Sequence, residues 1–313
     1  MIQQIKHYIE RLLFVRHAKY ISTQNSLEQI TDMIEAYTSC DTFTFKMTNF
    51  SLLKEEQKPE YADVWFSERQ VHDECYNVFS FFKDNEYMIL DIGANAGYSV
   101  TSFYSTGVTC PIFSFEAFNI HQKNLEYIKN KIAPLNNCKY NFSITGLSDE
   151  ESKVRFMMPV INQTGISALA RSNINDPQAL ANLIDQYIKD FYKNSKNYLS
   201  IAEFDITLST LDKFIFAHPD DFQLPVAAMK IDVEGMEYNV LRGAVNTIKR
   251  FIPLIMSEGD DQKINSFLTP LGYHKGFYSN GCISFDCENK FYNVFYVHKN
   301  NIPKYKEIGL VSL

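Results

Sequence analysis

The spacing of apolar and polar positions changes near residue 87 of the chain. Beyond it, five short apolar runs alternate with stretches of helical spacing, and they cover residues 88–92, 112–115, 141–147, 227–233 and 253–257. Strands that alternate with helices form a mostly parallel sheet with helices on both faces. The pattern predicts a Rossmann-like, doubly wound α/β domain over residues 87–313.

Two later segments depart from this alternation. The β-rich runs 281–285 and 291–297 flank a turn-prone stretch and predict a closing antiparallel hairpin. Residues 172–196 are polar and helix-forming, without a strong apolar stripe. This helical insert is equally compatible with a lid over a site and with a solvated helix on the outside of the domain.

The first 86 residues have helical spacing and no alternation of strands and helices. Amphipathic stretches over residues 1–20, 26–37 and 67–82 predict a mainly helical N-terminal extension. The first stretch has a basic face opposite its apolar face. We expect it to pack on its own domain or on a second subunit of a homo-oligomer, with a membrane-surface anchor as the alternative.

Composition narrows the class of protein. With 313 residues, 45% of them hydrophobic, the chain can build one large core and an accessory region. A formal charge of −7 argues against a nucleic-acid partner, because proteins that bind phosphates usually carry a basic surface. Six cysteines without a C-x-x-C pair, and the lack of a continuous apolar segment, predict a cytoplasmic chain with no transmembrane segment.

The strand at 88–92 runs into a glycine-bearing turn. Residues 91–97 read Asp-Ile-Gly-Ala-Asn-Ala-Gly and open a helix. Gly93 and Gly97 would let the backbone approach a nucleotide-like ligand. Counted from Gly93, the other two glycine positions of the dinucleotide motif hold Asn95 and Tyr98, so we expect a cofactor without a diphosphate.

The charge at this turn selects among such cofactors. Asp91 would repel a phosphate but attract the cationic amino group or the sulfonium region of S-adenosylmethionine, directly or through water. A cap on the following helix is the alternative role for Asp91. We therefore predict that Asp91, Gly93, Asn95 and Gly97 form part of an S-adenosylmethionine site.

The second strand adds a further cofactor ligand. It ends in Glu116, where an α/β fold presents a carboxylate to the two hydroxyl groups of a ribose. A surface acid after a buried strand is the alternative. His121 follows closely enough to lie near an adenosine, although we expect a surface position for it.

Four blocks of the sequence are similar to those of a known family. They cover residues 91–95, 115–117, 208–212 and 230–237, the last reading Lys-Ile-Asp-Val-Glu-Gly-Met-Glu and followed by Val-Leu-Arg-Gly-Ala at 240–244. In these blocks the chain resembles the FkbM family of class I methyltransferases, over about residues 88–300. The resemblance implies a seven-stranded sheet and methyl transfer from S-adenosylmethionine, usually to a hydroxyl oxygen. The family commonly has proline after the glutamate of the second strand, where this chain has Ala117.

Acidic residues also follow the strands at 227–233 and 253–257. Asp232, Glu234 and Glu258 would reach the cleft at the carboxyl edge of the sheet, with Asp232 and Glu234 on one side if the strand persists. Lys230 lies inside the apolar strand, where an unpaired charge is costly. We expect it to form an ion pair with one of three acids: Asp91, Asp232 or Glu237.

Methyl transfer to an alcohol requires removal of the hydroxyl proton. Asp232 is the predicted catalytic residue and also a cofactor contact, with Glu234 and Glu258 as its catalytic neighbours. A magnesium ion held by Asp232 and Glu258 is the alternative to a hydrogen-bonding role for these carboxylates.

These observations favour an O-methyltransferase that acts on a hydroxylated small molecule, such as a sugar of a glycan or a secondary metabolite. Two other classes remain as alternatives. The glycine spacing disfavours a nicotinamide-dependent oxidoreductase, and the intact set of Asp91, Gly93, Glu116 and Asp232 disfavours a noncatalytic scaffold with a methyltransferase-like fold.

Overall fold

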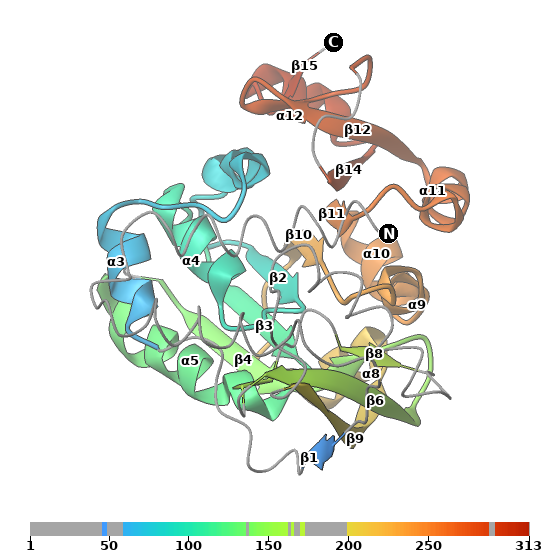
Figure 1. The fold of residues 1–313 in the computed structure, drawn as a ribbon. Coiled ribbons are helices and arrows are strands. Elements are labelled where there is room, and N and C mark those ends of the chain that lie inside the picture. Colours follow the sequence, from blue (N-terminus) through green and yellow to red (C-terminus); the bar gives the residue numbers. More distant parts are fainter. Residues whose placement is uncertain are drawn as a thin grey trace. The chain divides into compact units, whose positions relative to one another are not determined.

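The structure of the chain is a computed structural model. It describes residues 46–48, 59–135, 138–161, 164–165, 170–172, 199–287 and 292–312. The chain divides into two compact units, and we treat each by itself (Figure 1). One unit contains residues 57–154 and 206–313, and the other contains residues 1–56 and 155–205.

The main sheet of the larger unit has nine strands in the part of the chain that the structure describes. In spatial order the strands are β15 (Val311–Ser312), β13 (Cys282–Ser284), β12 (Tyr273–Ser279), β14 (Asn293–His298), β11 (Leu254–Glu258), β10 (Val226–Ile231), β2 (Met88–Ile92), β3 (Ile112–Glu116) and β4 (Tyr140–Ile144). The five strands from β11 to β4 are parallel, and β14 runs antiparallel to β11.

The order of strands places a crevice at the middle of the sheet. From β2 the chain proceeds outward through β3 and β4 on one side, and β10 and β11 occupy the other side (Figure 1). In open α/β sheets, ligands bind at the carboxyl ends of the strands where the order reverses in this way. The ends of β2 and β10 therefore mark the position at which to look for a site.

The mixed α/β class is confirmed, but the strand count and the hairpin need correction. The short strands β13 and β15 extend the expected seven-stranded sheet to nine among the described residues. The predicted pairing of 281–285 with 291–297 is wrong, because β12 lies between β13 and β14 and pairs with both. A two-residue turn at Asn280 and Gly281, both with positive φ, closes the hairpin from β12 to β13 instead.

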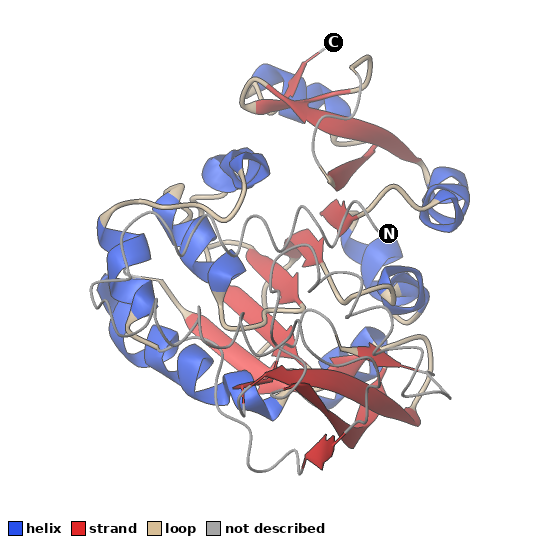
Figure 2. Ribbon diagram, in the orientation of Figure 1, coloured by secondary structure: helices blue, strands red, loops and turns tan. Residues whose placement is uncertain are grey.

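Helices cover both faces of the sheet (Figure 2). The alternation along β2 shows this: Ile89 packs in one core cluster with Phe79 and Phe103, and Leu90 packs in the other with Leu211 and Val240. The first cluster takes its helical residues from α3 (Tyr61–Ser67), the 3-10 helix η2 (Glu74–Phe81), α4 (Tyr98–Ser105), the π-helical turn η4 (Ile128–Ile132), α6 (Ala133–Leu135) and α12 (Ile302–Glu307). The second cluster includes α8 (Leu211–Ala217), α9 (Glu237–Arg242), α10 (Val245–Phe251) and α11 (Gln262–Leu268).

Three further helical segments complete this unit: η3 (Asn119–His121), α5 (Gln122–Tyr127) and η7 (Thr269–Leu271). The predicted helix over 67–82 is interrupted. Helix α3 ends at Ser67, and Asp73 then caps η2 by accepting a hydrogen bond from the Cys75 N–H at 2.9 Å. Residues 61–82, which the sequence grouped with the N-terminal extension, pack in the same compact unit as the sheet.

The predicted strand over 141–147 splits into β4 and β5 (Gly146–Leu147), which belong to different sheets. In the second sheet, β9 (Leu199–Ser209) pairs with β5 and with β1 (Lys46–Thr48). On its other side lies β6 (Ser152–Ile161). Strand β6 in turn pairs with two short strands, β7 (Thr164–Gly165) and β8 (Arg171–Ser172). Strand β1 lies in a stretch that the sequence predicted to be mainly helical. The predicted helices over 1–20 and 26–37, and the insert beyond residue 172, lie outside the described residues.

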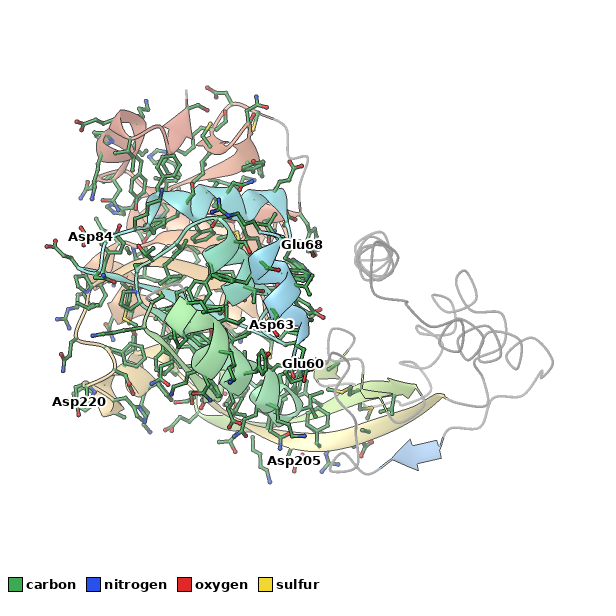
Figure 3. The ribbon with its side chains drawn as sticks, turned by 90° about the vertical axis from the view of Figure 1, so that its left-hand side faces the viewer. Glu60, Asp63, Glu68, Asp84, Asp205 and Asp220 are labelled. Atoms are coloured by element: carbon green, nitrogen blue, oxygen red, sulfur yellow. The ribbon has the colours of Figure 1, made fainter. Side chains whose placement is uncertain are left out.

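The described surface carries many exposed carboxylates, in agreement with the formal charge of −7. Figure 3 labels six of them: Glu60, Asp63, Glu68, Asp84, Asp205 and Asp220. Among the described helices, none is long and apolar enough to cross a membrane.

Candidate active site

Four acidic residues gather at the carboxyl edge of the four central strands. Asp91 lies in β2, Glu116 ends β3, Asp232 follows β10 directly, and Glu258 ends β11. Because these strands are parallel neighbours, their carboxyl ends meet at one edge of the sheet. The structure thus brings together acids that lie far apart in the sequence, with 167 positions from the first, Asp91, to the last, Glu258.

The turn after β2 is shaped by contacts within the protein. Gly93 has φ of +81°, and a Cβ there would collide with the backbone carbonyl of Asp232. Gly97 has φ of +91°, and a Cβ there would collide with the side chain of Ile128. Packing against backbone therefore requires glycine at position 93, and the positive φ favours glycine at position 97, whether or not a ligand also approaches the turn.

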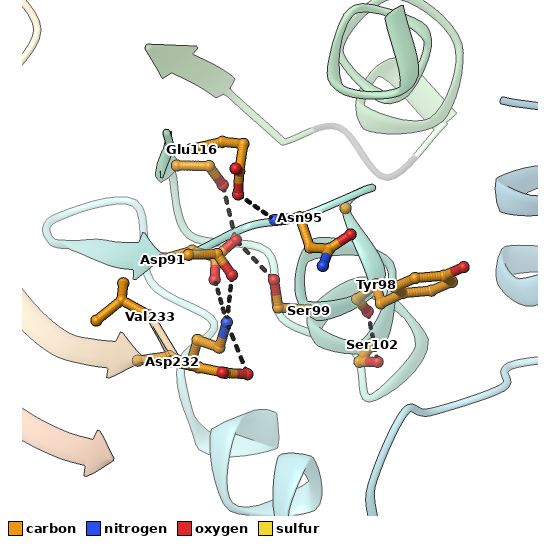
Figure 4. A network of polar contacts seen from close by, with 12 residues as sticks. Asp91, Asn95, Tyr98, Ser99, Ser102, Glu116, Asp232 and Val233 are labelled. Carbon is orange, nitrogen blue, oxygen red and sulfur yellow. Dashed lines mark hydrogen bonds and ion pairs between the residues drawn. The ribbon is translucent and has the colours of Figure 1, made fainter. Parts of the chain in front are cut away.

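Asp91 lies beneath this turn, with 0% of its surface exposed. Its Oδ2 accepts hydrogen bonds from Ser99 Oγ at 2.7 Å and Ser114 Oγ at 2.8 Å (Figure 4). Its Oδ1 lies 3.5 Å from the Lys230 ammonium. In this arrangement Asp91 has no surface for direct contact with a ligand, and it supports the start of α4 and Lys230.

Lys230 forms the ion pairs expected from the sequence. Its Nζ lies 3.5 Å from both Asp91 Oδ1 and Asp232 Oδ2, and it donates a hydrogen bond to the Gly93 carbonyl oxygen at 2.7 Å. Burial lowers the pKa of Lys230, but the Asp232 and Asp91 carboxylates outweigh this and raise it above its ordinary value. Lys230 is therefore a charged ammonium in the folded protein.

Glu116 joins the two loops on its side of the crevice. Its Oε2 accepts the Asn95 N–H at 2.7 Å (Figure 4), and its Oε1 accepts the Phe118 N–H at 2.7 Å. Burial raises the pKa of Glu116 to about 7, although these two hydrogen bonds act in the opposite direction. Asn95 itself has a positive φ of 51°, and its side chain accepts the Ala96 N–H at 2.7 Å, which stabilises the turn.

The chain after β10 forms a sharp turn, which corrects one expectation. Strand β10 ends at Ile231, and Glu234 has a positive φ of 58°, so Asp232 and Glu234 do not alternate along a strand. Glu237 holds the turn closed, because its Oε1 accepts the N–H groups of Val233 at 2.9 Å and Gly235 at 3.1 Å. Glu237 is thus a structural acid of the motif.

Asp232 and Glu258, at the ends of the neighbouring strands β10 and β11, act on one another. Burial raises the pKa of Glu258 well above its ordinary value, and the charges of Asp232 and Glu234 and a side-chain hydrogen bond with Asp232 raise it further. The side chain of Asp232 is 31% exposed. The pair therefore places an accessible side chain, that of Asp232, beside a buried acid whose pKa is raised.

Two tyrosines at this edge were not found from the sequence. Burial raises the pKa of Tyr292, and the charges of Glu258 and Glu237 add to this. Burial also raises the pKa of Tyr76, which Lys230 opposes. Tyr292 reaches the site because β14, which follows it, pairs with β11. Tyr76 reaches the site because η2 packs on the sheet. Both contacts join segments that are distant in the sequence, so neither has a local signal.

His121 is buried rather than at the surface, so that expectation was wrong. Only 1% of the residue is exposed, and burial lowers the pKa of its ring to about 3. The ring is therefore neutral, and its Nε2 has no hydrogen-bond partner among the described residues.

Other parts of the sequence motif have structural roles. Asp212 accepts hydrogen bonds from the backbone N–H groups of Asn246 at 2.8 Å and Thr247 at 2.9 Å, and it thereby caps the start of α10. A Cβ on Gly243 would collide with the backbone of Ser148. These residues fix the helices that cover the sheet rather than the site itself.

The Methyltransferase FkbM domain model matches residues 91–275, more than half of the chain. The chain belongs to the FkbM methyltransferase family. The resemblance inferred from the four sequence blocks is thus confirmed, and methyltransferase is the class of activity that goes with this family. The FkbM match includes Asp91, Glu116, Asp232 and Glu258, whereas the two tyrosines of the site lie outside it.

Two solved structures are more distantly similar to this FkbM-family chain. The methyltransferase FkbM from Methylobacillus flagellatus KT is 15% identical with a TM-score of 0.42, and the alignment covers 76% of this chain and 50% of that one. The precorrin-6y C5,15-methyltransferase from Geobacter metallireducens GS-15 is 11% identical with a TM-score of 0.29, covering 84% and 95%. The chain spans about half the length of the Methylobacillus protein. No curated protein matches it.

Proposed function

We propose that this chain transfers a methyl group from S-adenosylmethionine to a hydroxyl oxygen of a sugar, glycan or secondary-metabolite acceptor. The observation that carries the proposal is the placement of the exposed Asp232 side chain beside Lys230 and Glu258, one strand away from the glycine turn and two strands away from Glu116. A ligand-binding acid and a proton-accepting acid thus lie on opposite sides of the point where the strand order reverses.

The residues on the β2 and β3 side fit the cofactor. Each carboxylate oxygen of Glu116 accepts one backbone N–H, and a carboxylate has about four acceptor positions, so it can also accept the two ribose hydroxyl groups. The turn holding Gly93, Asn95 and Gly97 lies beside it. When bound, S-adenosylmethionine supplies a methyl group activated by a sulfonium charge. Asp91 supports this side through Lys230 and α4.

The residues on the β10 and β11 side fit the proton transfer. Asp232 accepts the proton of the acceptor hydroxyl as its oxygen attacks, which contributes about 10² to 10⁴ in rate for a well-placed base. Glu258, whose pKa is raised by burial, shares a hydrogen bond with Asp232. Glu234 adds negative charge beside the pair, although it sits in the turn and not on the strand.

The same two carboxylates do not fit a magnesium site. The Lys230 ammonium lies 3.5 Å from Asp232 Oδ2 and already balances the charge of this carboxylate. Within the described residues, no group of three or more His, Cys, Asp or Glu side chains is placed to hold a metal ion. We therefore derive no step through a metal.

Calorimetric titration of the purified chain with S-adenosylmethionine and S-adenosylhomocysteine tests the cofactor, with NADH as the control ligand. We expect saturable binding of the first two and none of NADH. Release of S-adenosylhomocysteine with hydroxylated sugars then tests the acceptor class, with amines as the matched comparison. If the chain binds none of these ligands, the alternative of a noncatalytic scaffold with a methyltransferase-like fold is favoured.

The remaining expectations belong to this proposal as well. We propose a cytoplasmic enzyme that acts without nucleic acid and associates with itself through its N-terminal helices. Light scattering of the full chain and of a chain without residues 1–40 tests the association. An unchanged mass after the deletion would contradict it.

A further inference from the structure

The Lys230 ammonium is the one charged donor among the described residues that contacts both halves of the site. It donates a hydrogen bond to Gly93 O at 2.7 Å and forms ion pairs with Asp91 Oδ1 and Asp232 Oδ2, each at 3.5 Å. With 2% of its surface exposed, Lys230 is shielded from bulk water.

The backbone around Lys230 is fixed by two further contacts. The Asp232 N–H donates to the Ile92 carbonyl at 3.0 Å, and Gly93 packs against the Asp232 carbonyl so closely that a Cβ would not fit. These contacts set where Asp232 leaves the sheet, but they do not set the direction of its carboxylate. Its side-chain contacts are the ion pair with Lys230 on one strand and the hydrogen bond with Glu258 on the next.

The two acids that flank Lys230 differ in their access to a ligand. Asp91 has no exposed surface, whereas the side chain of Asp232 is 31% exposed. The charge of Lys230 therefore balances a buried carboxylate and leaves Asp232 as the one that faces outward. The other titratable groups around Asp232 are Glu234, Glu237, Glu258, Tyr76 and Tyr292.

We propose that Lys230 is a positioning residue, which aims the Asp232 carboxylate at the crevice and sets the net charge that this edge presents to the sulfonium of the methyl donor. The inference rests on the proposed function. It adds a role for a residue that touches neither the cofactor nor the acceptor.

The two cofactor forms provide a direct measure of this charge. S-adenosylmethionine carries a sulfonium, and S-adenosylhomocysteine carries a neutral thioether at the same place. The ratio of their dissociation constants therefore reports the electrostatic environment of the sulfur. For Lys230→Met we expect the ratio to shift in favour of S-adenosylmethionine by about tenfold, measured by calorimetry at pH 8 and pH 9, because a positive charge near the sulfonium is lost.

Two variants separate charge from structure. Lys230→Arg keeps the charge and should keep the ratio of the unaltered chain. The double variant Asp91→Asn with Lys230→Met removes one charge of each sign, so its ratio should also return to that of the unaltered chain. It also avoids leaving Asp91 buried without a partner, which is the reason that Lys230→Met alone is at risk of unfolding. Circular dichroism confirms that each variant is folded.

The outcomes distinguish a failure of the role proposed for Lys230 from a failure of the proposed function. A tenfold shift in Lys230→Met that is reversed in the double variant supports the inference. If Lys230→Met is folded and keeps the original ratio, or if the double variant differs from the unaltered chain as much as the single one does, the inference is overturned while the proposed function stands. If Lys230→Met does not fold, a double-variant ratio equal to that of Lys230→Arg supports the inference, and an unequal one overturns it. An unaltered chain that binds neither ligand overturns the proposed function itself.

Discussion

At the ends of β2 and β3, the carboxylates of Asp91 and Glu116 are buried, and each accepts two hydrogen bonds from the protein. At the ends of β10 and β11, Asp232 and Glu258 lie against each other, and burial and the Asp232 charge raise the pKa of Glu258. The first pair is satisfied by fixed donors and suits the binding of a ligand in one orientation. The second pair is joined by a side-chain hydrogen bond and suits the exchange of a proton with a substrate.

The largest expected effect comes from breaking the second pair. In Asp232→Asn, the amide cannot accept the proton of the acceptor hydroxyl, so turnover should fall by about 10² to 10⁴. Affinity for S-adenosylmethionine should change much less, because the ribose contact lies at Glu116. Turnover is followed by release of S-adenosylhomocysteine and affinity by calorimetry. A fully active variant would remove Asp232 from the mechanism.

The close contact between Gly93, after β2, and the backbone of Asp232, after β10, should not tolerate one added methyl group. Gly93→Ala combines the strain of a positive φ with a collision against the Asp232 backbone, so the free energy of unfolding should fall by about 3 kcal/mol or more. Gly107 is the matched control, because its φ is also positive, at +89°, and no described atom lies within 4 Å of a Cβ placed on it.

We expect Gly107→Ala to cost about 1 kcal/mol, which is the cost of the backbone conformation alone. Denaturant unfolding of both variants measures the difference. Equal losses would mean that the turn after β2 can move away from Asp232.

Removing the acid of the first pair should weaken cofactor binding rather than turnover. Glu116→Ala loses charge-assisted hydrogen bonds to the ribose, so binding of S-adenosylmethionine should weaken by about 1 to 3 kcal/mol. Glu116→Gln is the control, because it keeps the shape and one acceptor. Unchanged affinity in a folded Glu116→Ala chain would refute the ribose assignment.

The smallest effect is the dependence of this binding on pH. Burial raises the pKa of Glu116 to about 7, so the carboxylate is mostly protonated at pH 6 and mostly ionised at pH 8. If the ionised form binds the ribose, affinity should increase by about tenfold between these values. In Glu116→Gln the increase should be absent, and a slope that persists there would assign it to another group.

The same raised pKa gives the opposite sign for folding. A carboxyl group whose pKa is higher in the folded state binds its proton more tightly there, so it favours the folded state below the ordinary pKa of glutamate. That contribution is lost as the pH rises toward about 7. Cofactor affinity and the stability of the cofactor-free chain should therefore change in opposite directions over this range.

Much of the central sheet was predictable because its signals are local. Strands β2, β3, β10 and β11 lie within a residue or two of the predicted runs, since buried parallel strands are short and continuously apolar. The acids at their ends were predictable for the same reason. The Lys230 ion pair followed from the cost of burying a charge, which requires a partner close by.

The remaining features depend on contacts between distant segments. The run over 281–285 pairs with β12 and not with 291–297, because a tight turn at Asn280 and Gly281 competes with the longer connection. Tyr76 reaches the acids only because η2 packs on the sheet. Glu234 leaves the strand because the chain turns at Asp232, which alternation alone does not reveal.

The sequence by itself determined the α/β class, the family blocks and the four acids that end the strands, because each depends on residues that are neighbours in the chain. Only the tertiary structure decided how those acids differ. Glu116 is held by two backbone N–H groups, burial and the Asp232 charge raise the pKa of Glu258, and Asp91 is buried against Lys230. Identical carboxyl groups acquire distinct roles here because burial, nearby charge and hydrogen bonding act through space and not along the chain.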